Sequence, residues 1–416
     1  MMKSHQEIVR IYFKYLTQTN FDKAKDFMER QRSVLLSSVW PKPLFNILCD
    51  FAVAEKNYSD TNFEPEKNKL VARKEDENYL DFVYKTLFQD LGLLQEEVED
   101  NYILEFITSL SKFISIRIKL LEFYDKLYEV GSSYSNIDFK ELAETIEQIQ
   151  SEVVIPSAID GAMQILEYEL DSMKHLFYCH WHLENWLYIE SVLSLKRGSD
   201  AIIMWEKCYE NKESWKFGSL FMSKNPLPRL VLWFKKFKLM TVSKFTLYFY
   251  KVLLEFTTYH DMRYFCNNYN LNLFTKMQLL HKKSEAQSVM LVFDTSELTN
   301  YKGPGYWSPS RDIVDPDIKY QIMLSFPKVP IKLDVLEKLI SENNEDEFSM
   351  NKSSIIYIGK AAYLIMRVDT RITFIIFYNS KPKNEEKEKS NTFEFISQLR
   401  CHRLFPLINS SNYLVH

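Results

Sequence analysis

The chain has 416 residues, enough for about two or three domains, and its 46% hydrophobic and 26% charged residues are typical of folded globular proteins. The formal net charge is -4 and no part of the chain is strongly basic, which excludes the concentrated basic footprint of a dedicated nucleic-acid binder. Only 8 residues are glycine, and this argues against glycine-rich phosphate loops, tight β-meanders and nucleophile elbows.

The cysteines and the apolar segments predict a soluble, intracellular protein. The five cysteines are widely scattered, and none forms a Cys-x-x-Cys pair, as is typical of a reducing compartment. The first residues are charged and amphipathic and lack an apolar core of signal-peptide length. The most apolar stretch, 230–256, contains five lysines, and each lysine costs about 2.5–3.5 kcal/mol at the centre of a membrane span, so we expect no crossing there.

Helical patterns follow one another from the start of the chain to about residue 283. We expect helices over 5–30, 43–58, 74–95, 101–130, 138–152, from Pro156 onward, over 199–210 and over 228–258, with loops at 58–68 and 212–227. In 101–130 the apolar positions nearly encircle the helix, and Gly131 follows as a stop signal. This indicates a central bundle helix or a seam along which two copies of the chain pair. Arg117 interrupts the apolar seam, and we expect it either to extend its charged end to solvent or to pair with a carboxylate at the edge of the core.

From Ala286 the pattern changes to short apolar runs of β type. They cover 287–293, 320–326, 355–358, 363–368 and 372–378, with a helix at 333–343 and a final helix from about Thr392. The last two runs are joined by Asp369-Thr-Arg371 and predict a hairpin. A long loop rich in Gly and Pro spans 294–316, and the charged stretches 345–347 and Lys381–Lys389 are expected to be mobile loops.

These elements predict a mainly α protein with a smaller α+β domain. The first domain, 1–283, is expected to be a multi-helix up-down bundle. The second, 284–416, has the order β-β-α-β-β-β-α and is expected to hold a small antiparallel sheet covered by helices.

One stripe of possible metal ligands falls on the helix that follows Pro156. His175, Cys179 and His182 lie at i, i+4 and i+7, so they share one face, and zinc takes such nitrogen and sulfur ligands. No second Cys/His pair has the spacing to supply a fourth ligand. The stripe also lies opposite the helix's apolar seam, so it points to solvent or to a second packing layer. A metal-binding protein centred on Cys179 and His182 is therefore an alternative interpretation only.

Two other patterns point to contact surfaces. Gly303-Pro-Gly305 precedes Tyr306 and Trp307, but no helix opens after the glycines as a phosphate cradle requires, so we expect a shaped surface loop whose aromatic residues contact partners. The aromatic and lysine-rich segment from Trp233 to Phe256 is the basis of a second alternative, a single-stranded nucleic-acid binder. A packed core with lysines at its wet edge explains the same residues. No catalytic signature occurs, and we expect neither an enzyme nor a cofactor.

A series of motifs resembles the KICSTOR subunit 2 family and runs in one order along nearly the whole chain. In the first domain they are Phe21-Asp-Lys-Ala-Lys-Asp26, Ala54-Glu-Lys-x-Tyr58, Arg117-x3-Leu121-x-Phe-Tyr-Asp-Lys-Leu-Tyr128, Leu230-x-Leu-Trp233, Lys236-x-Lys238-x-Met240 and Lys244-Phe-x2-Tyr248. In the second they are Leu291-x-Phe-Asp294, Gly303-x-Gly-Tyr306, Ile372-Thr-Phe-Ile-Ile-Phe and Ser380-Lys381. Two features depart from the family pattern, the mixed-charge stretch ending at Lys389 and the Cys179/His182 stripe.

The resemblance implies a non-catalytic subunit of the KICSTOR complex, which recruits GATOR complex 1 to the lysosomal surface and restrains mTOR complex 1 when amino acids, and also glucose, are scarce. It further implies kaptin, an integrin-alpha FG-GAP repeat protein and the large seizure-threshold scaffold as partners. We expect a cytoplasmic protein that reaches the lysosomal membrane peripherally, through these partners. Candidate contact residues are Trp233, Lys236, Lys238, Tyr306 and Trp307.

Overall fold

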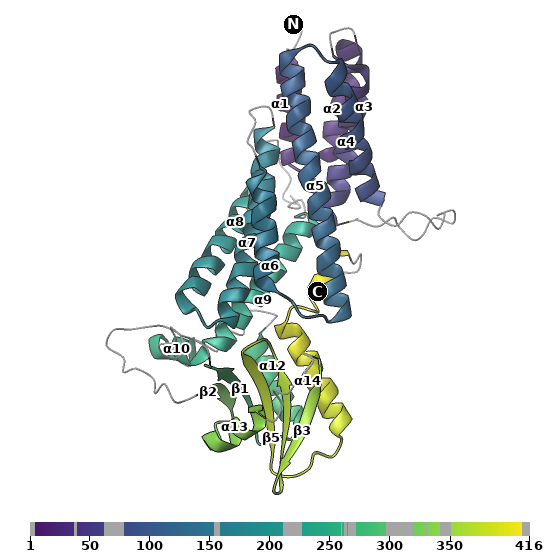
Figure 1. Cartoon of the computed structure of the whole chain (residues 1–416). Helices are drawn as coiled ribbons and strands as arrows, with labels where there is room; N and C mark the ends of the chain where they lie inside the picture. Colours follow the sequence, from purple (N-terminus) through teal and green to yellow (C-terminus); the bar gives the residue numbers. More distant parts are fainter. Residues whose placement is uncertain are drawn as a thin grey trace, which may run out of the picture.

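The computed structural model of the chain describes residues 5–36, 40–61, 79–153, 159–210, 227–258, 272–296, 319–329, 331–341 and 351–409, together with 260, 261 and 264. Three groups of elements follow one another along an elongated molecule (Figure 1). Helices α1 to α5 form one end, α6 to α9 form the middle, and a five-stranded sheet with its helices forms the other end.

The helical part is built from long helices. They are α1 (His5–Thr17), α2 (Phe21–Leu36), α3 (Lys42–Ser59), α4 (Tyr79–Glu97), α5 (Asn101–Ser133), α6 (Phe139–Ser151), α7 (Asp160–Glu184), α8 (Tyr188–Glu210), α9 (Arg229–Tyr248) and α10 (Tyr250–Phe256). Local chemistry explains several of their starts, since the side chains of Asp100 and Asp138 accept hydrogen bonds from the first turns of α5 and α6, and Pro228 precedes α9. Among the helices of the described ranges, none is both long and apolar enough to span a membrane.

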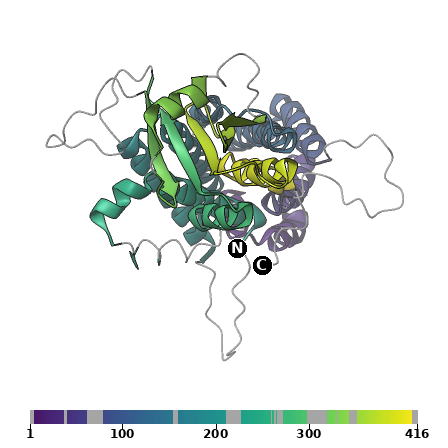
Figure 2. The ribbon, with the colours of Figure 1, turned by 90° about the horizontal axis from the view of Figure 1, so that it is seen from below.

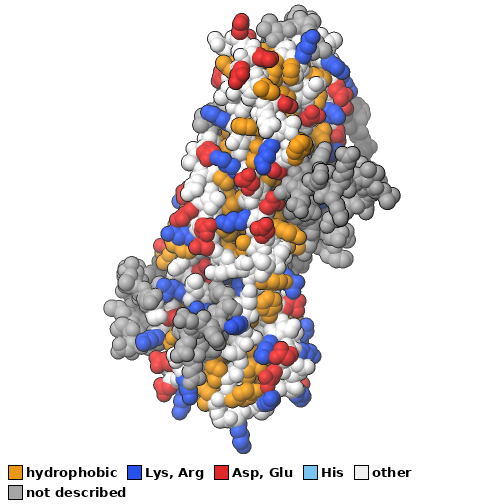
Figure 3. Space-filling model, turned by 45° about the vertical axis from the view of Figure 1, so that its right-hand side comes forward, with side chains coloured by type: hydrophobic (Ala, Val, Ile, Leu, Met, Phe, Trp, Pro, Cys, Tyr) orange, Lys and Arg blue, Asp and Glu red, His pale blue; other side chains and the backbone are white. Residues whose placement is uncertain are grey.

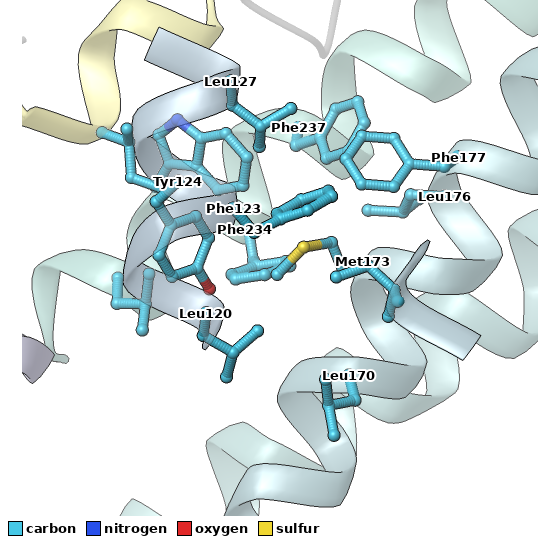
Figure 4. Packing of buried hydrophobic residues seen from close by; sticks show 14 of the residues in the cluster. Leu120, Phe123, Tyr124, Leu127, Leu170, Met173, Leu176, Phe177, Phe234 and Phe237 are labelled. Atoms are coloured by element: carbon cyan, nitrogen blue, oxygen red, sulfur yellow. The ribbon is translucent and has the colours of Figure 1, made fainter. Parts of the chain in front are cut away.

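The helices of the two groups meet over one apolar core. Side chains of α5, α7 and α9 point toward one another there, among them Leu120, Phe123, Leu170, Met173, Phe177 and Phe237 (Figure 4). All of these are buried, and the same cluster continues without interruption into one face of the sheet, through Val289, Leu291 and Phe374. The helical part and this sheet face thus share a single core.

The sheet is antiparallel throughout and has the strand order β2-β1-β5-β4-β3. Its strands are β1 (Ser288–Asp294), β2 (Tyr320–Phe326), β3 (Ser353–Ile358), β4 (Ala361–Arg367) and β5 (Ile372–Tyr378). Helices α12 (Leu273–Ser284) and α14 (Glu385–Leu399) lie side by side on the face that joins the main core (Figure 2). Helix α13 (Leu333–Ser341) covers the other face over a second, smaller core, and a 3-10 helix, η1 (Phe405–Asn409), follows α14.

The predicted fold class is confirmed, including the order β-β-α-β-β-β-α. The predicted domain boundary at 283/284 falls at the end of α12, which packs against α14 and β1 on one side and α9 on the other, so the division into 1–283 and 284–416 stays a prediction. The predicted Gly/Pro loop 294–316 and the charged stretch 345–347 lie largely or wholly outside the described residues.

Several predicted helix limits are wrong. The helix over 5–30 is two helices, separated by Thr19 with a positive φ of 53°, and the helix over 228–258 breaks at Phe249 between α9 and α10. The charged stretch Lys381–Lys389 is not a mobile loop along its whole length, because α14 already begins at Glu385. The Asn384 side chain accepts a hydrogen bond from the Lys387 N–H, and acidic residues fill the first turn, where they favour the helix dipole.

Gly131 does not stop α5, which continues to Ser133. A Cβ at position 131 would lie 2.5 Å from Cδ of Pro406 and 2.9 Å from Cβ of Phe405, so the glycine permits α5 to contact the segment around η1 closely. The helix ends instead at Tyr134, which has the left-handed conformation with φ 55°.

We expect Gly131→Ala to destabilise the protein by about 1–3 kcal/mol, because the added methyl group overpacks the contact with Pro406. Gly92→Ala in α4 is the matched control, since no atom lies within 4 Å of a Cβ there, and it should raise stability by about 0.5–1 kcal/mol. Urea unfolding followed by circular dichroism measures both. Equal midpoints for the two variants would contradict the packing role of Gly131.

Candidate functional site

A buried ion cluster lies where α3, α5 and α7 meet. Arg117 on α5 is 3% exposed, and its guanidinium donates to both carboxylate oxygens of Glu55 on α3, at 3.1 Å each. It also donates to Glu169 on α7 at 2.6 Å. Burial lowers the pKa of Arg117, but Glu55, Tyr58 and Glu169 raise it more, so that it stands well above its ordinary value. Of the two expectations for Arg117, pairing with a carboxylate is confirmed and extension to solvent is wrong; the expected position at the edge of the core is also wrong, since Arg117 and both glutamates are buried.

Three buried tyrosines complete the hydrogen bonding of the two carboxylates. Tyr84 donates to Glu55 at 2.7 Å, and both Tyr58 and Tyr124 donate to Glu169. The Tyr58 ring also lies over the guanidinium, with 3.9 Å between Cζ and the ring centroid. Burial and the nearby carboxylates raise the pKa of all three tyrosines, so their hydroxyls stay protonated and can donate.

A small hollow adjoins this cluster and is lined by Glu55, Arg117 and Glu169 together with apolar side chains. Its volume is about 30 Å³. A buried water needs about 10–15 Å³, so the hollow has room for water and none for a substrate. The cluster therefore acts as a structural connection between helices.

A second polar cluster lies where α7 and α9 meet the hairpin between β4 and β5. Lys244 on α9 is 1% exposed, and its Nζ lies 3.7 Å from a carboxylate oxygen of Glu184 and 3.5 Å from Nδ1 of His180, both on α7. One turn later Tyr248 donates to Asp369 of the hairpin at 2.9 Å. Charged groups from the helices and from the sheet thus share one buried junction.

Burial determines the protonation of this junction. It raises the pKa of Glu184 to about 8, although Lys244 opposes the change, and it also raises the pKa of Asp369. It lowers the pKa of His180 well below its ordinary value, which keeps that imidazole neutral. Glu184 therefore tends to hold a proton at a pH where an exposed glutamate would be ionised.

The segment after α14 returns to the helices and fastens them to the sheet. His402 Nε2 lies 2.7 Å from the carbonyl oxygen of Ser135, and Trp233 donates from Nε1 to the carbonyl of Leu404 at 3.2 Å. Phe405 is fully buried among the aromatic rings of Phe139, Phe177, Trp233 and Phe237. The C-terminal segment is thus part of the helical core.

The predicted stripe of His175, Cys179 and His182 faces a second packing layer, helix α8. Position 198 on α8 is a glycine whose Cβ would lie 3.5 Å from Cβ of His175, and His182 Nδ1 lies 3.2 Å from Oγ of Ser194. Cys179 is fully buried, which raises the pKa of its thiol, and burial lowers the pKa of His175 to about 4. Within the described ranges no three His, Cys, Asp or Glu side chains come together so as to hold a metal ion.

The aromatic residues of α9 lie inside the protein. Trp233 is 5% exposed, and Phe234 and Phe237 are fully buried (Figure 4 labels the two phenylalanines). They are therefore not available as a stacking surface for nucleic-acid bases. The predicted partner contact at Trp233 likewise has almost no exposed surface in this conformation.

The other candidate contact residues stay predictions. Lys236 and Lys238 are half-buried at the edge of α9, and this burial lowers the pKa of both. Tyr306 and Trp307 lie outside the described residues. None of these positions forms part of the two buried clusters. The sequence pattern singled out Arg117, and the family motifs contain further cluster members, namely Glu55, Tyr58, Tyr124, Lys244 and Tyr248, but the sequence did not show that they come together.

Two helices expose apolar side chains that the sequence analysis did not single out. On α4, Phe82 and Leu93 are 69% and 66% exposed, and they lie three turns apart on the same side. On α8, a line of exposed residues runs along the helix; we call it the α8 stripe, and it consists of Ile189, Leu193, Lys196, Asp200, Ile203 and Lys207, flanked by Val192 and Met204. On the side shown in Figure 3, hydrophobic side chains are interspersed with acidic and basic ones.

The sequence matches one known family over nearly its whole length. The model of the family described as KICSTOR complex C12orf66 like matches residues 2–411. The chain belongs to this family. It is 24% identical to KICSTOR subunit 2 of Xenopus laevis, over 97% of this chain and 96% of that protein. It is 22% identical to KICSTOR subunit 2 of Danio rerio, over 96% of this chain and 94% of that protein. The predicted resemblance is therefore confirmed, and it makes the chain a KICSTOR complex subunit by family.

We expect Arg117→Met to destabilise the protein by about 3–5 kcal/mol, because Glu55 and Glu169 are left buried without a counter-charge. The triple variant Arg117→Met/Glu55→Gln/Glu169→Gln removes all three charges and keeps carbonyl oxygens for the tyrosines, so it should recover much of this loss. Urea unfolding compares the three proteins. A triple variant less stable than the single one would contradict the role of charge balance.

We expect stability to fall as the pH rises from about 4.5 to about 8 and to level off above that, because the folded protein keeps a proton on Glu184 up to a pKa of about 8 that the unfolded chain releases near 4.5. Asp369, whose pKa is also raised, acts in the same direction. Glu184→Gln should flatten this fall, whereas the exposed control Glu129→Gln should not. The midpoint of urea unfolding is measured across the pH range. If the midpoint falls with pH as steeply in Glu184→Gln as in the wild type, the proton on Glu184 does not cause the fall.

Proposed function

We propose that this protein is a non-catalytic subunit of a KICSTOR-like complex that recruits GATOR complex 1 to the lysosomal surface and so restrains mTOR complex 1 signalling during amino-acid and glucose starvation. The observation that carries the proposal is the family match, which extends from residue 2 to residue 411 and leaves no room for a large unrelated domain in this stretch. Kaptin, the integrin-alpha FG-GAP repeat protein, the large seizure-threshold scaffold and GATOR complex 1 are the proposed partners.

The geometry supports a binding role. The buried ions of the first cluster pair with one another and connect three helices, and the hollows beside the two clusters have volumes of only about 30 Å³ and 20 Å³. Neither is large enough for a substrate, since ligand pockets usually measure about 300–1,000 Å³. The exposed apolar side chains on α4 are instead the kind of surface that marks a protein contact.

Helix α4 is our proposed contact with another KICSTOR subunit. Phe82 and Leu93 are about two-thirds exposed, and a partner that buries them gains binding energy from the apolar surface removed from water. The helix itself is held by Tyr84, Leu87 and Leu91, which are buried against the rest of the bundle. Changes on the outer side should therefore leave the fold intact.

We expect Phe82→Glu/Leu93→Glu to reduce co-purification of the other KICSTOR subunits at least tenfold, because two charges would be placed in a dry interface. Gln89→Glu lies between them on the exposed side and adds a charge without removing apolar surface, so it should have a much weaker effect. The tagged variants are purified from cells and their partners quantified by mass spectrometry. Circular dichroism confirms folding, and full co-purification of the double variant would contradict the proposed contact.

The localisation and signalling proposals have a separate test. Cells that lack the protein should keep mTOR complex 1 active during amino-acid starvation and should lose GATOR complex 1 from lysosomes. Re-expression of the wild-type chain should restore both, and the α4 double variant should restore neither. Normal starvation responses in the absence of the protein would refute the proposed function.

A further inference from the structure

The α8 stripe has the spacing of a coiled-coil seam, although nothing in the described structure covers it. The spacing between its successive residues alternates between four and three, at positions 189, 193, 196, 200, 203 and 207. The core positions a and d of a coiled-coil heptad have the same spacing. Ile189, Leu193 and Ile203 are 46%, 51% and 38% exposed. At about 100° of rotation per residue, all six positions lie on one side of the helix.

The opposite side of α8 is pressed against α7. A Cβ at Gly198 would lie 3.2 Å from Cγ of Leu176, so the two helices approach closely at this point. Ser191 and Ala201 are buried on the same side. Helix α8 lies at the outside of the middle group, and the stripe therefore faces away from the protein (Figure 1).

The stripe has nearly the same pattern from either end. Leu193 and Ile203 lie five positions on either side of residue 198, and Lys196 and Asp200 lie two positions on either side. If two copies of α8 pack antiparallel about a two-fold axis at this midpoint, each residue meets its counterpart in the other copy. Leu193 then faces Ile203 of the other copy, so an a position of one helix meets a d position of the other. This pairing of a with d is characteristic of antiparallel helix pairs, whereas parallel pairs place a opposite a and d opposite d.

The central charges favour this arrangement over others. Within one chain Lys196 pairs with Asp200 on the helix surface. In the antiparallel pair Lys196 of each copy lies opposite Asp200 of the other, and two such pairs form around the axis. A parallel pair would instead place Lys196 opposite Lys196, and like charges in a seam oppose association.

We propose that the α8 stripe is the interface of a symmetric homodimer, in which two α8 helices pack antiparallel about a two-fold axis near residue 198. The apolar residues on both sides of the central charges supply the buried surface, with Val192 and Met204 at its margins. The central charge pairs fix the direction and the register. A helix from a different protein would not require the stripe to be symmetric, and this is why we assign the surface to a second copy. The proposal does not depend on the function proposed above.

Mixing of cysteine variants tests the geometry. Leu193→Cys and Ile203→Cys are prepared separately in the full chain, each in a Cys208→Ser/Cys266→Ser background. In the antiparallel dimer the new cysteine of one copy lies about 15 Å along the helix axis from the same cysteine of the other copy. A disulfide requires Cα atoms within about 7 Å, so identical variants cannot be joined. Oxidation should therefore give little covalent dimer from either variant alone and abundant covalent dimer from the mixture.

Charge variants test the same register without a covalent bond. Lys196→Glu makes the centre of the stripe acidic and Asp200→Lys makes it basic, so each variant should dimerise at least tenfold more weakly than the wild type in sedimentation. Their equimolar mixture should restore dimers, since opposite charges then face each other. Phe82→Glu on the distant α4 is the control, and it should dimerise as the wild type does.

Four results would overturn the proposal. The first is a wild-type chain that stays monomeric at tens of micromolar. The second and third concern the charge variants: both dimerise as the wild type does, or their mixture stays monomeric. The fourth is abundant covalent dimer from one cysteine variant alone. If the chain is monomeric and the α8 variants instead lose a KICSTOR partner on purification, the stripe belongs to another subunit and the homodimer is refuted.

Discussion

The packing of the helical part depends on the burial of one arginine between two glutamates. Removing such charges from water costs several kcal/mol per ion, and this cost is offset only where Glu55, Arg117 and Glu169 meet in the correct geometry. A shift of α3, α5 or α7 by one turn would leave a buried charge unpaired. Apolar burial is non-directional, so the surrounding apolar contacts distinguish such registers less sharply. The cluster therefore favours one register among many that the apolar contacts alone would permit.

Much of the fold could be predicted from the sequence, because strands and long helices produce local patterns. The apolar runs 320–326 and 372–378 match β2 and β5 to the residue. Arg117 stood out because it interrupts an apolar seam. Its partners could not be named, since Glu55, although it lies in the motif Ala54–Tyr58, and Glu169 look like surface residues until three helices from different parts of the chain are placed together. Long-range pairing of this kind leaves no local pattern.

The candidate surfaces were missed for a different physical reason. On an ordinary surface helix the apolar side faces the core. The first half of helix α8 departs from this pattern, because its inner side uses Ser191, Ser194 and Gly198 to approach α7 closely, while Leu193 faces outward. The second half buries Ile202 and Trp205 but also exposes Ile203. The sequence analysis recognised only its second half, 199–210. Which side of such a helix is exposed becomes clear only when its neighbours are known.

The position of Phe405 has a consequence for how the protein is made. This residue comes near the end of the chain, yet its ring fills a place among Phe139, Phe177 and Phe237, which leave the ribosome much earlier. During synthesis the aromatic core consequently stays open until Phe405 emerges. Until then a nascent chain of this protein should present that apolar opening to chaperones. A chain truncated shortly before Phe405 would keep the opening permanently, so a truncation far from the helices in sequence should destabilise the helical core.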